Sequence, residues 1–316
     1  MATMTSNISV PPTGTPPPAH ARRSSDRPSP RPPRTPSGTP RITLRRLTGG
    51  FGTVLLCLGT VLFVLPFLFT VVTSLRTAAD LARSPLGIPH SLTLKNFTDA
   101  FNQIHYGPST LNTLFITALS CVAVTVIGSL AAYPLARITQ HWSTTVYRLF
   151  ILGTSVPVFV VVAPLYLLMR DLNLLDSYAG MVLIYTALNL PVAVFFYTSF
   201  IRSIPGDLEE AAALDGCGAL RTFITIILPL LRPVTSTLLT FISLQVWNDL
   251  LVPLVFVQDP GKRTVMVNAY SFIDPHTVQP TTLFPAALLG VLPLLIIFVF
   301  LQRQVVAGMS AGAVKS

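Results

Sequence analysis

Residues 204–216 read IPGDLEEAAALDG, a short polar segment that lies between two long apolar runs. Asp207 is a good helix N-cap, and Glu210 follows three residues later, which is the spacing of a capping box. Glu209 and Glu210 favour the positive end of a helix dipole, and Gly216 suits a left-handed stop. The three alanines have the highest helix propensity. The segment therefore predicts a helix of about two turns, roughly 12 Å long, followed by a sharp bend.

The rest of the chain is unusually apolar. Hydrophobic residues make up 51% and charged residues 10% of the 316 positions, whereas a soluble domain carries about 25% charged residues. A bilayer core requires about 20 apolar residues per helix. Six runs have roughly that length, and they are Phe51–Val72, Leu114–Ala136, Leu149–Met169, Met181–Ile201, Pro233–Phe256 and Leu283–Leu301. The composition predicts an all-α membrane protein with six transmembrane helices, in which residues 223–228 form a helix at the membrane surface and Pro233 lies near the first turn of the fifth span.

The charge distribution predicts the orientation and the domain limits. Residues 1–46 are rich in Pro and Arg and predict a disordered cytoplasmic tail, residues 47–303 the membrane domain, and residues 304–316 a cytoplasmic C-terminal tail. With both termini in the cytoplasm, inside segments hold 15 Lys and Arg residues and outside segments hold 6, as the positive-inside rule requires. Because the formal net charge of +9 resides largely in the tail and beside apolar runs, it does not indicate a nucleic-acid partner.

The sequence shows no means of using ATP by itself. Its Gly-Lys pair, Gly261-Lys262, lacks the upstream glycine and the following Ser or Thr of a P-loop. No H-E-x-x-H or G-x-S-x-G motif is present, so we expect no catalytic residue, no metal site and no cofactor. From the residues alone, segment 204–216 is equally well an ordinary capped loop helix or a docking element for another protein.

A family resemblance favours the docking element. The order E-A-A, three residues, G, nine residues, I-x-L-P resembles the EAA signature of carbohydrate-uptake ABC permeases of the maltose-transporter type. Further segments resemble that family: Asn112 and the stretch ending in Arg137, residues 172–177, and Trp247-Asn248-Asp249. The resemblance covers roughly residues 50–316 and implies that loop 204–229 is a cytoplasmic coupling helix with its flanks. The residues that it implies contact the ATPase are Asp207, Glu209, Glu210, Ala211, Ala212, Asp215, Gly216, Ile226, Leu228 and Pro229.

The resemblance also implies partners and a substrate class. The partners are ABC ATPase subunits, a second permease subunit in a heterodimer, and an extracytoplasmic solute-binding protein. The six runs are expected to hold no Asp, Glu, Lys or His at mid-span, which disfavours an ion-coupled carrier. Their uncharged polar residues suit a sugar or oligosaccharide, although interhelical hydrogen bonding explains any one of them as well. We expect Asn189, Pro191, Trp247 and Asn248 to line the solute path. The alternatives are an ion-coupled secondary transporter and an ABC permease for a non-sugar solute.

Overall fold

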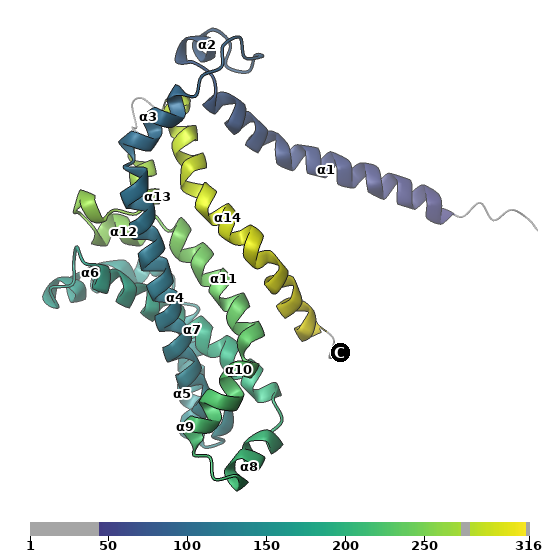
Figure 1. Cartoon of the computed structure of the whole chain (residues 1–316), viewed down its shortest axis with the longest axis vertical. Coiled ribbons are helices and arrows are strands. Elements are labelled where there is room, and N and C mark those ends of the chain that lie inside the picture. Colours follow the sequence, from purple (N-terminus) through teal and green to yellow (C-terminus); the bar gives the residue numbers. More distant parts are fainter. Residues whose placement is uncertain (1–43, 273–278, 314–316) are drawn as a thin grey trace, which may run out of the picture. The chain divides into compact units, whose positions relative to one another are not determined.

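The computed structural model describes residues 44–272 and 279–313, and within these residues every regular element is a helix (Figure 1). An isolated bridge between Arg76 and Leu92 is the exception to the helical pairing. Packing divides the chain into two compact units, residues 1–57 and residues 58–316. In the first unit, the described residues 44–57 form the beginning of α1.

The elements follow one another along the chain with short connections. They are α1 (Leu44–Ser74), α2 (Ala78–Arg83), α3 (Lys95–Gln103), α4 (Tyr106–Arg137), α5 (His141–Gly153), α6 (Val158–Asp171), α7 (Tyr178–Ser203), α8 (Asp207–Leu214), α9 (Ala219–Thr222), the π-helix η1 (Phe223–Ile227), α10 (Leu228–Leu230), α11 (Arg232–Asn248), α12 (Leu251–Phe256), the 3-10 turn η2 (Pro260–Lys262), α13 (Val265–Tyr270) and α14 (Pro280–Ala313).

Four of the predicted spans are continuous apolar helices, contained in α1, α4, α7 and α14. The prediction that the third span is one helix is wrong, because α5 and α6 are bent by 103° where the chain passes through residues 154–157. Pro157 is the N-cap of α6, and a proline ring would clash with the preceding turn if the helix continued. If each bent pair forms one span, the described chain has up to six.

The fifth predicted span is also interrupted. Pro233 lies in the first turn of α11, as expected. Residues Ala219–Leu230 meet α11 at an angle of 72°. At its other end α11 stops at Asn248, and the chain resumes as α12 at Leu251. The run Pro233–Phe256 is therefore two helices separated by Asp249 and Leu250.

Helices cross both of the predicted domain limits. The helix α1 begins at Leu44, inside the segment expected to be a disordered tail, and α14 continues to Ala313 through most of the segment 304–316. Residues 1–43 and 314–316, which carry the rest of both predicted tails, lie outside the described residues. An apolar run marks the part of a helix that a bilayer can hold, and a helix can extend beyond it wherever the backbone permits.

The packing of α4 against α7 is the most extensive helix contact in the chain. A Cβ placed on Gly128 of α4 would lie 2.8 Å from the Cβ of Ala193 on α7, so only glycine allows the two backbones this close. Small residues at such crossings are typical of helices that pack within a membrane. The main core gathers around this pair and includes Tyr197 of α7, Phe223 of η1 and Leu238 of α11.

Candidate functional site

The helix α8 lies at the end of the bundle opposite α3 (Figure 1). Its N-cap is Gly206, whose carbonyl accepts hydrogen bonds from the backbone N–H of Glu209 (2.8 Å) and Glu210 (3.1 Å). Asp207 is the first helical residue, and no side chain caps this terminus. The predicted capping box between Asp207 and Glu210 is therefore wrong. The three acidic residues of the first turn still favour the positive end of the helix dipole.

The C-terminus of α8 matches the prediction. Gly216 has a positive φ of 77°, the left-handed conformation that glycine adopts without steric cost. Its N–H donates to the carbonyl of Ala213 (3.0 Å), and the N–H of Cys217 donates to the carbonyl of Ala212 (2.9 Å). These two bonds form a Schellman motif, which satisfies the last carbonyls of a helix. A fixed turn therefore separates α8 from α9.

One carboxylate joins α8 to the end of α4. Glu209 Oε1 accepts a hydrogen bond from Nε of Arg137 (2.7 Å), the last residue of α4, and lies 2.6 Å from Nη2 of the same guanidinium in an ion pair. Its other oxygen, Oε2, accepts from the hydroxyl of Tyr133 at 3.0 Å. The side chains of Arg137 and Glu209 are 25% and 18% exposed. At this burial, water screens the ion pair less than it screens a surface pair.

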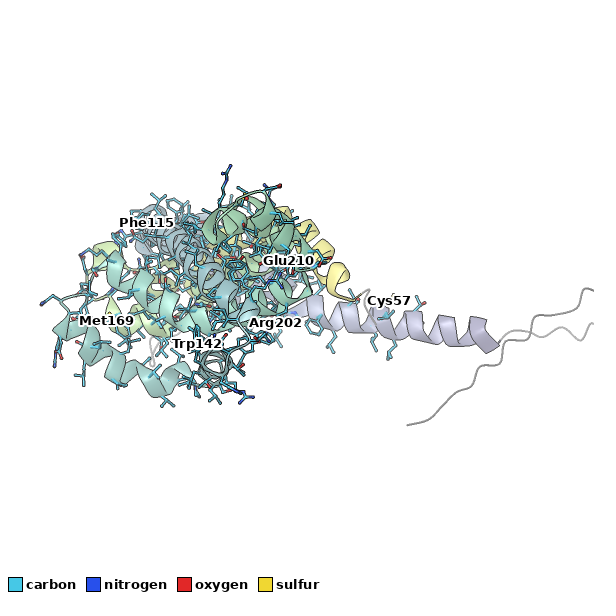
Figure 2. All side chains as sticks on the ribbon, turned by 90° about the horizontal axis from the view of Figure 1, so that it is seen from below. Cys57, Phe115, Trp142, Met169, Arg202 and Glu210 are labelled. Atoms are coloured by element: carbon cyan, nitrogen blue, oxygen red, sulfur yellow. The ribbon has the colours of Figure 1, made fainter. Side chains whose placement is uncertain are left out.

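Arginines also join the ends of α4 and α7 reciprocally. Arg137 Nη2 donates to the carbonyl of Ile204, the residue that ends α7, at 3.0 Å. Arg202 of α7 donates to the carbonyl of Leu135 on α4 at 3.3 Å. The guanidinium of Arg202 also lies 4.7 Å from the ring centre of Tyr147 on α5. Figure 2 looks at the molecule from below, with Arg202 and Glu210 labelled. These hydrogen bonds and the cation–π contact thus hold the ends of α4, α5 and α7 together beside α8.

Some side chains of α8 are buried against the rest of the chain, and the others are exposed. Ala212 is buried and Glu209 is half-buried. Leu208 is exposed, and Leu214 is 90% exposed. The other predicted ATPase-contact residues of this segment are also exposed, namely Asp207, Glu210, Ala211, Asp215 and Gly216. The exposed side of α8 therefore combines carboxylates at its start with a leucine at its end.

The returning limb of the loop also packs on α4. The ring of Phe223 lies 5.3 Å from that of Tyr133. Ile226 and Leu228 are half-buried, whereas Pro229 is exposed. The widened turn η1 ends just before Pro229, whose ring crowds the carbonyl four residues earlier, at Thr225. Tyr133 therefore contacts both limbs of the loop, through Glu209 on α8 and Phe223 on the returning limb.

The four residues predicted to line the solute path do not form one surface. Asn189 is buried and donates to the carbonyl of Tyr185 in its own helix (2.9 Å). Trp247 is buried, and its Nε1–H donates to the carbonyl of Gly290 on α14 (3.0 Å). Pro191 is half-buried, and Asn248 is exposed. Of these residues, Asn248 is the one whose side chain is exposed.

Asp249 is an acidic residue inside one of the apolar runs, which were expected to hold none at mid-span. It lies in the fifth predicted span, at the break between α11 and α12. Its Oδ2 accepts a hydrogen bond from the hydroxyl of Tyr185 on α7 (2.9 Å), and its Oδ1 accepts from the N–H of Leu251 (3.0 Å). The carboxylate therefore binds the N–H of the first residue of α12 and links this helix to α7. Sequence reasoning included Asp249 in a motif without giving it a role.

A second polar cluster lies at the opposite end of α4 from Arg137. The amide of Asn112 donates to the carbonyls of Gly261 (2.9 Å) and Arg263 (3.1 Å), and its oxygen accepts from the hydroxyl of Tyr178 at 2.8 Å. The carboxylate of Asp176 accepts from the N–H of Gln258 and of Asp259, and its carbonyl accepts from Lys262 Nζ. Two segments that carried the family resemblance, Asn112 and residues 172–177, thus hold loop 257–264 on the bundle.

The described residues contain no group of three or more His, Cys, Asp or Glu side chains that could hold a metal ion. The polar atoms that converge at α8 are one carboxylate, one guanidinium and one phenol, which make a mechanical joint. Arg137 and Tyr133 were not predicted as site residues. The sequence does carry a signal for this ion pair, because a basic residue, Arg137, follows the second apolar run and an acidic residue, Glu209, follows the fourth.

Comparison with known proteins identifies the family. Residues 124–311 match the family described as binding-protein-dependent transport system inner membrane component. The melibiose/raffinose/stachyose import permease protein MelC of Bacillus subtilis (strain 168) is 36% identical over 252 residues, covering 79% of this chain and 91% of that protein. The diacetylchitobiose uptake system permease protein NgcG of Streptomyces coelicolor is 30% identical over 263 residues, with 83% and 87% coverage.

A solved structure has the same fold. A chain of a bacterial ABC transporter that imports the acidic polysaccharide alginate aligns with a TM-score of 0.73 and 20% identity, over 85% of this chain and 99% of that one. Several helices of the present chain are long and apolar enough to cross a membrane. The chain is thus a multi-pass membrane protein, and it belongs to the binding-protein-dependent transport system inner membrane component family of ABC transporter permeases.

Proposed function

We propose that this chain is the permease subunit of an ATP-driven importer for a sugar or oligosaccharide, and that α8 is its coupling helix. The observation that carries the proposal is the geometry of α8. This helix is rigidly terminated at Gly216, joined to α4 through Glu209, and exposes Leu214 almost completely. We assign the exposed side of α8, which includes Leu208 and Leu214, to contact with a partner.

The partner at α8 is an ABC ATPase subunit. The exposed side of α8 presents Asp207, Glu210 and Asp215 beside Leu208 and Leu214. A groove that receives this helix therefore needs an apolar floor for the leucines and basic groups for the carboxylates. ATP hydrolysis belongs to that partner, since the sequence carries no P-loop. The complex further contains a second permease and a solute-binding protein. One related solved structure is described as an alginate ABC transporter in complex with a periplasmic protein bound to an alginate pentasaccharide.

The arrangement in the membrane follows from the charges. We propose six spans, of which the third is α5 with α6 and the fifth is α11 with α12, and both termini in the cytoplasm. With this orientation α8 and Arg137 lie on the cytoplasmic side, where an ATPase is accessible. The distribution of Lys and Arg, 15 inside against 6 outside, supports the orientation.

The substrate class rests on the relatives and on the spans. The relatives include permeases whose names specify melibiose, raffinose and stachyose, diacetylchitobiose, and starch degradation products. The residues proposed for the path, Asn189, Pro191, Trp247 and Asn248, carry no charge. We place Asn248 in contact with the solute, and assign Asn189 and Trp247 to shaping the path from behind.

An acidic saccharide is the second candidate, because the structural relative with the TM-score of 0.73 imports the acidic polysaccharide alginate. Asp249 argues against it for this chain. A carboxylate beside the exposed Asn248 would repel an anionic solute that passes it. Neutral sugars instead can donate hydroxyl hydrogen bonds to such a group.

The test reconstitutes the chain in vesicles alone and then with its second permease, ATPase and binding protein. We expect ATP-driven uptake of a labelled neutral saccharide by the complete complex and none by the lone chain. Uptake by the lone chain under a proton or sodium gradient would establish the ion-coupled alternative. ATP-driven uptake restricted to acidic saccharides would refute the neutral substrate and leave the importer standing.

The docking surface is tested separately. Leu214→Asp places a charge where an apolar contact is expected, and we expect it to abolish co-purification of the ATPase. The matched control is Leu86→Asp, since Leu86 is 87% exposed but lies in the loop after α2, near the other end of the bundle. Equal loss of ATPase in both variants would show that α8 is not the docking element.

A further inference from the structure

We propose that the Arg137–Glu209 ion pair, with the hydroxyl of Tyr133, is the joint through which a displacement of α8 reaches the membrane-spanning helices, and that α4 is the helix that receives it. This inference rests on the proposed function of α8 as the coupling helix. Arg137 and Tyr133 are positioning residues, because they act on the ATPase through α8. In this proposal, the displacement reaches α7 and the limb leading to α11, which are the covalent neighbours of α8, only as secondary routes.

The first argument is the strength and geometry of the joint. Two hydrogen bonds of 2.7 and 3.0 Å and an ion-pair contact of 2.6 Å converge on the two oxygens of one carboxylate. Hydrogen bonds between charged partners are shorter and about twice as strong as neutral ones. One hydrogen bond and the ion-pair contact come from one guanidinium, and the other hydrogen bond comes from a phenol one helical turn earlier on α4. Such a carboxylate cannot rotate without breaking at least one bond, so α8 is fixed in orientation as well as in position.

The second argument is that Arg137 also holds the connection that precedes α8. The chain from α7 reaches α8 through Ile204, Pro205 and Gly206, and the carbonyl of Ile204 accepts a hydrogen bond from Arg137 Nη2 at 3.0 Å. At the other end of α8, the two hydrogen bonds of the turn at Gly216 fix the helix where the chain leaves it. One residue of α4 therefore binds both α8 and the connection from α7.

The third argument is electrostatic. Glu209 lies in the first turn of α8, where the helix dipole favours a negative charge, and Arg137 is the last residue of α4, where the dipole favours a positive charge. The joint therefore pairs two side chains and two oppositely charged helix ends. Reversing the side chains would set each against its own dipole while preserving their mutual attraction.

The fourth argument is what α4 touches elsewhere. It is 32 residues long, about 48 Å at the helical rise. Near its other end, Asn112 holds the carbonyls of Gly261 and Arg263 in loop 257–264. The helix α4 is continuous from Tyr106 to Arg137, with Pro134 in its last turn. A displacement at Arg137 can therefore reach loop 257–264 within one helix.

The experiment uses the complete reconstituted complex and measures saccharide imported per ATP hydrolysed, together with basal ATPase activity and co-purification of all subunits. The variants are Arg137→Gln, Glu209→Gln, the mild Tyr133→Phe, and the exchanged pair Arg137→Glu with Glu209→Arg. The matched control is Arg148→Gln, which removes a cationic side chain from the exposed surface of α5.

We expect Arg137→Gln to keep assembly and basal ATPase activity while import per ATP falls about tenfold, a typical size for coupling between sites, and we expect Glu209→Gln to lower import per ATP at least as much. Tyr133→Phe should lower it about threefold, since it removes one neutral donor. The exchanged pair should recover part of the loss, and Arg148→Gln should behave like the original protein. A purely architectural role for the pair would instead lower assembly and basal activity together.

The inference is overturned if import per ATP is unchanged in Arg137→Gln and Tyr133→Phe, or if it falls only in proportion to lost assembly. In either case the unaltered complex would still import its saccharide with ATP, so the proposed function would stand. Failure of the unaltered complex to import any saccharide with ATP would instead count against the proposed function itself.

Discussion

The turn after α8 allows a sharply controlled perturbation, because this loop contains glycines that differ in backbone conformation alone. Gly216 has a φ of +77°, whereas Gly206 has a φ of −65°. A Cβ at either position would meet no atom within 4 Å. Replacing Gly216 therefore costs conformational energy without a steric clash against the rest of the fold. Replacing Gly206 costs neither.

The magnitude follows from the left-handed conformation. Placing a residue with a Cβ there costs about 1–2 kcal/mol, and a β-branched valine lies at the upper end of that range. The two Schellman hydrogen bonds, from Gly216 and Cys217, are expected to open together if the turn relaxes. A loss of about 1–2 kcal/mol corresponds to a factor of roughly 5–30 in the population of the opened segment.

Hydrogen–deuterium exchange of the peptide spanning residues 207–217 measures that population. We expect exchange about 5–30 times faster in Gly216→Val than in the original protein. Gly206→Ala should exchange at the original rate or more slowly, because alanine restricts the unfolded chain. ATPase co-purification should fall in the first variant and persist in the second. Equal exchange in both variants would refute the claim that the left-handed turn holds α8.

Three further predictions concern the rest of the chain. The hydrogen bond from Arg76 holds the pKa of the Asp80 carboxyl below its usual range. The stability that this carboxylate adds to the fold is therefore complete above the ordinary carboxyl pKa of about 4 and is lost as the pH falls through the lower pKa of the folded state. The melting temperature of Asp80→Asn should consequently change less over this acidic range than that of the original protein. In a version without native cysteines, a cysteine at Ile88 should react from outside the cell with an impermeant thiol reagent and one at Leu214 should not; the reverse would overturn the orientation. Gly128→Leu should lower the melting temperature markedly, since the Cβ alone would lie 2.8 Å from a facing side chain of α7; a melting temperature within error of the original would contradict the close packing.

Local sequence patterns predicted the helices that depend on local physics. Apolar length placed α1, α4, α7 and α14, and the proline at 233 placed the start of α11. Gly216 was predicted correctly because the requirement for positive φ belongs to one residue and its neighbours. The break between α5 and α6 is equally local. Pro157 signals it, but the surrounding apolar run hides the signal from a count of hydrophobic residues.

The start of α8 was misplaced because two local signals compete there. Asp207 is a good N-cap, yet Pro205 ends α7 and leaves Gly206 with a helical φ of −65° and ψ of −26°. The helix therefore begins one residue earlier, and the carboxylates become free for other roles. Glu209 binds Arg137, and Glu210 is exposed. Helix boundaries are uncertain by a residue or two, and here that difference changes the partner of a charged side chain.

The contacts that build the site were beyond prediction because they join distant positions. Glu209 and Arg137 are 72 residues apart, and Tyr185 and Asp249 are 64 apart. Each residue type has an ordinary local explanation, such as a basic residue flanking a span or a hydroxyl bonding within its own helix. The three-dimensional packing of α4 against α7 selects the long-range partner. Asp249 shows the consequence, since a carboxylate inside an apolar run gains its role only once α7 provides a donor.

The attachment of α8 to α4 also explains why one side of α8 is left uncovered in the isolated chain. Glu209 attaches the helix to α4 and Ala212 is buried, whereas Leu214 lies where the chain itself does not cover it. Full burial of a leucine contributes about 1.5–3 kcal/mol, and a flexible loop of this length would bury it against the nearest apolar surface. The joint at Arg137 and the turn at Gly216 prevent that collapse. They hold α8 in one orientation, so a partner that covers Leu214 gains its transfer free energy without the entropic cost of ordering the helix.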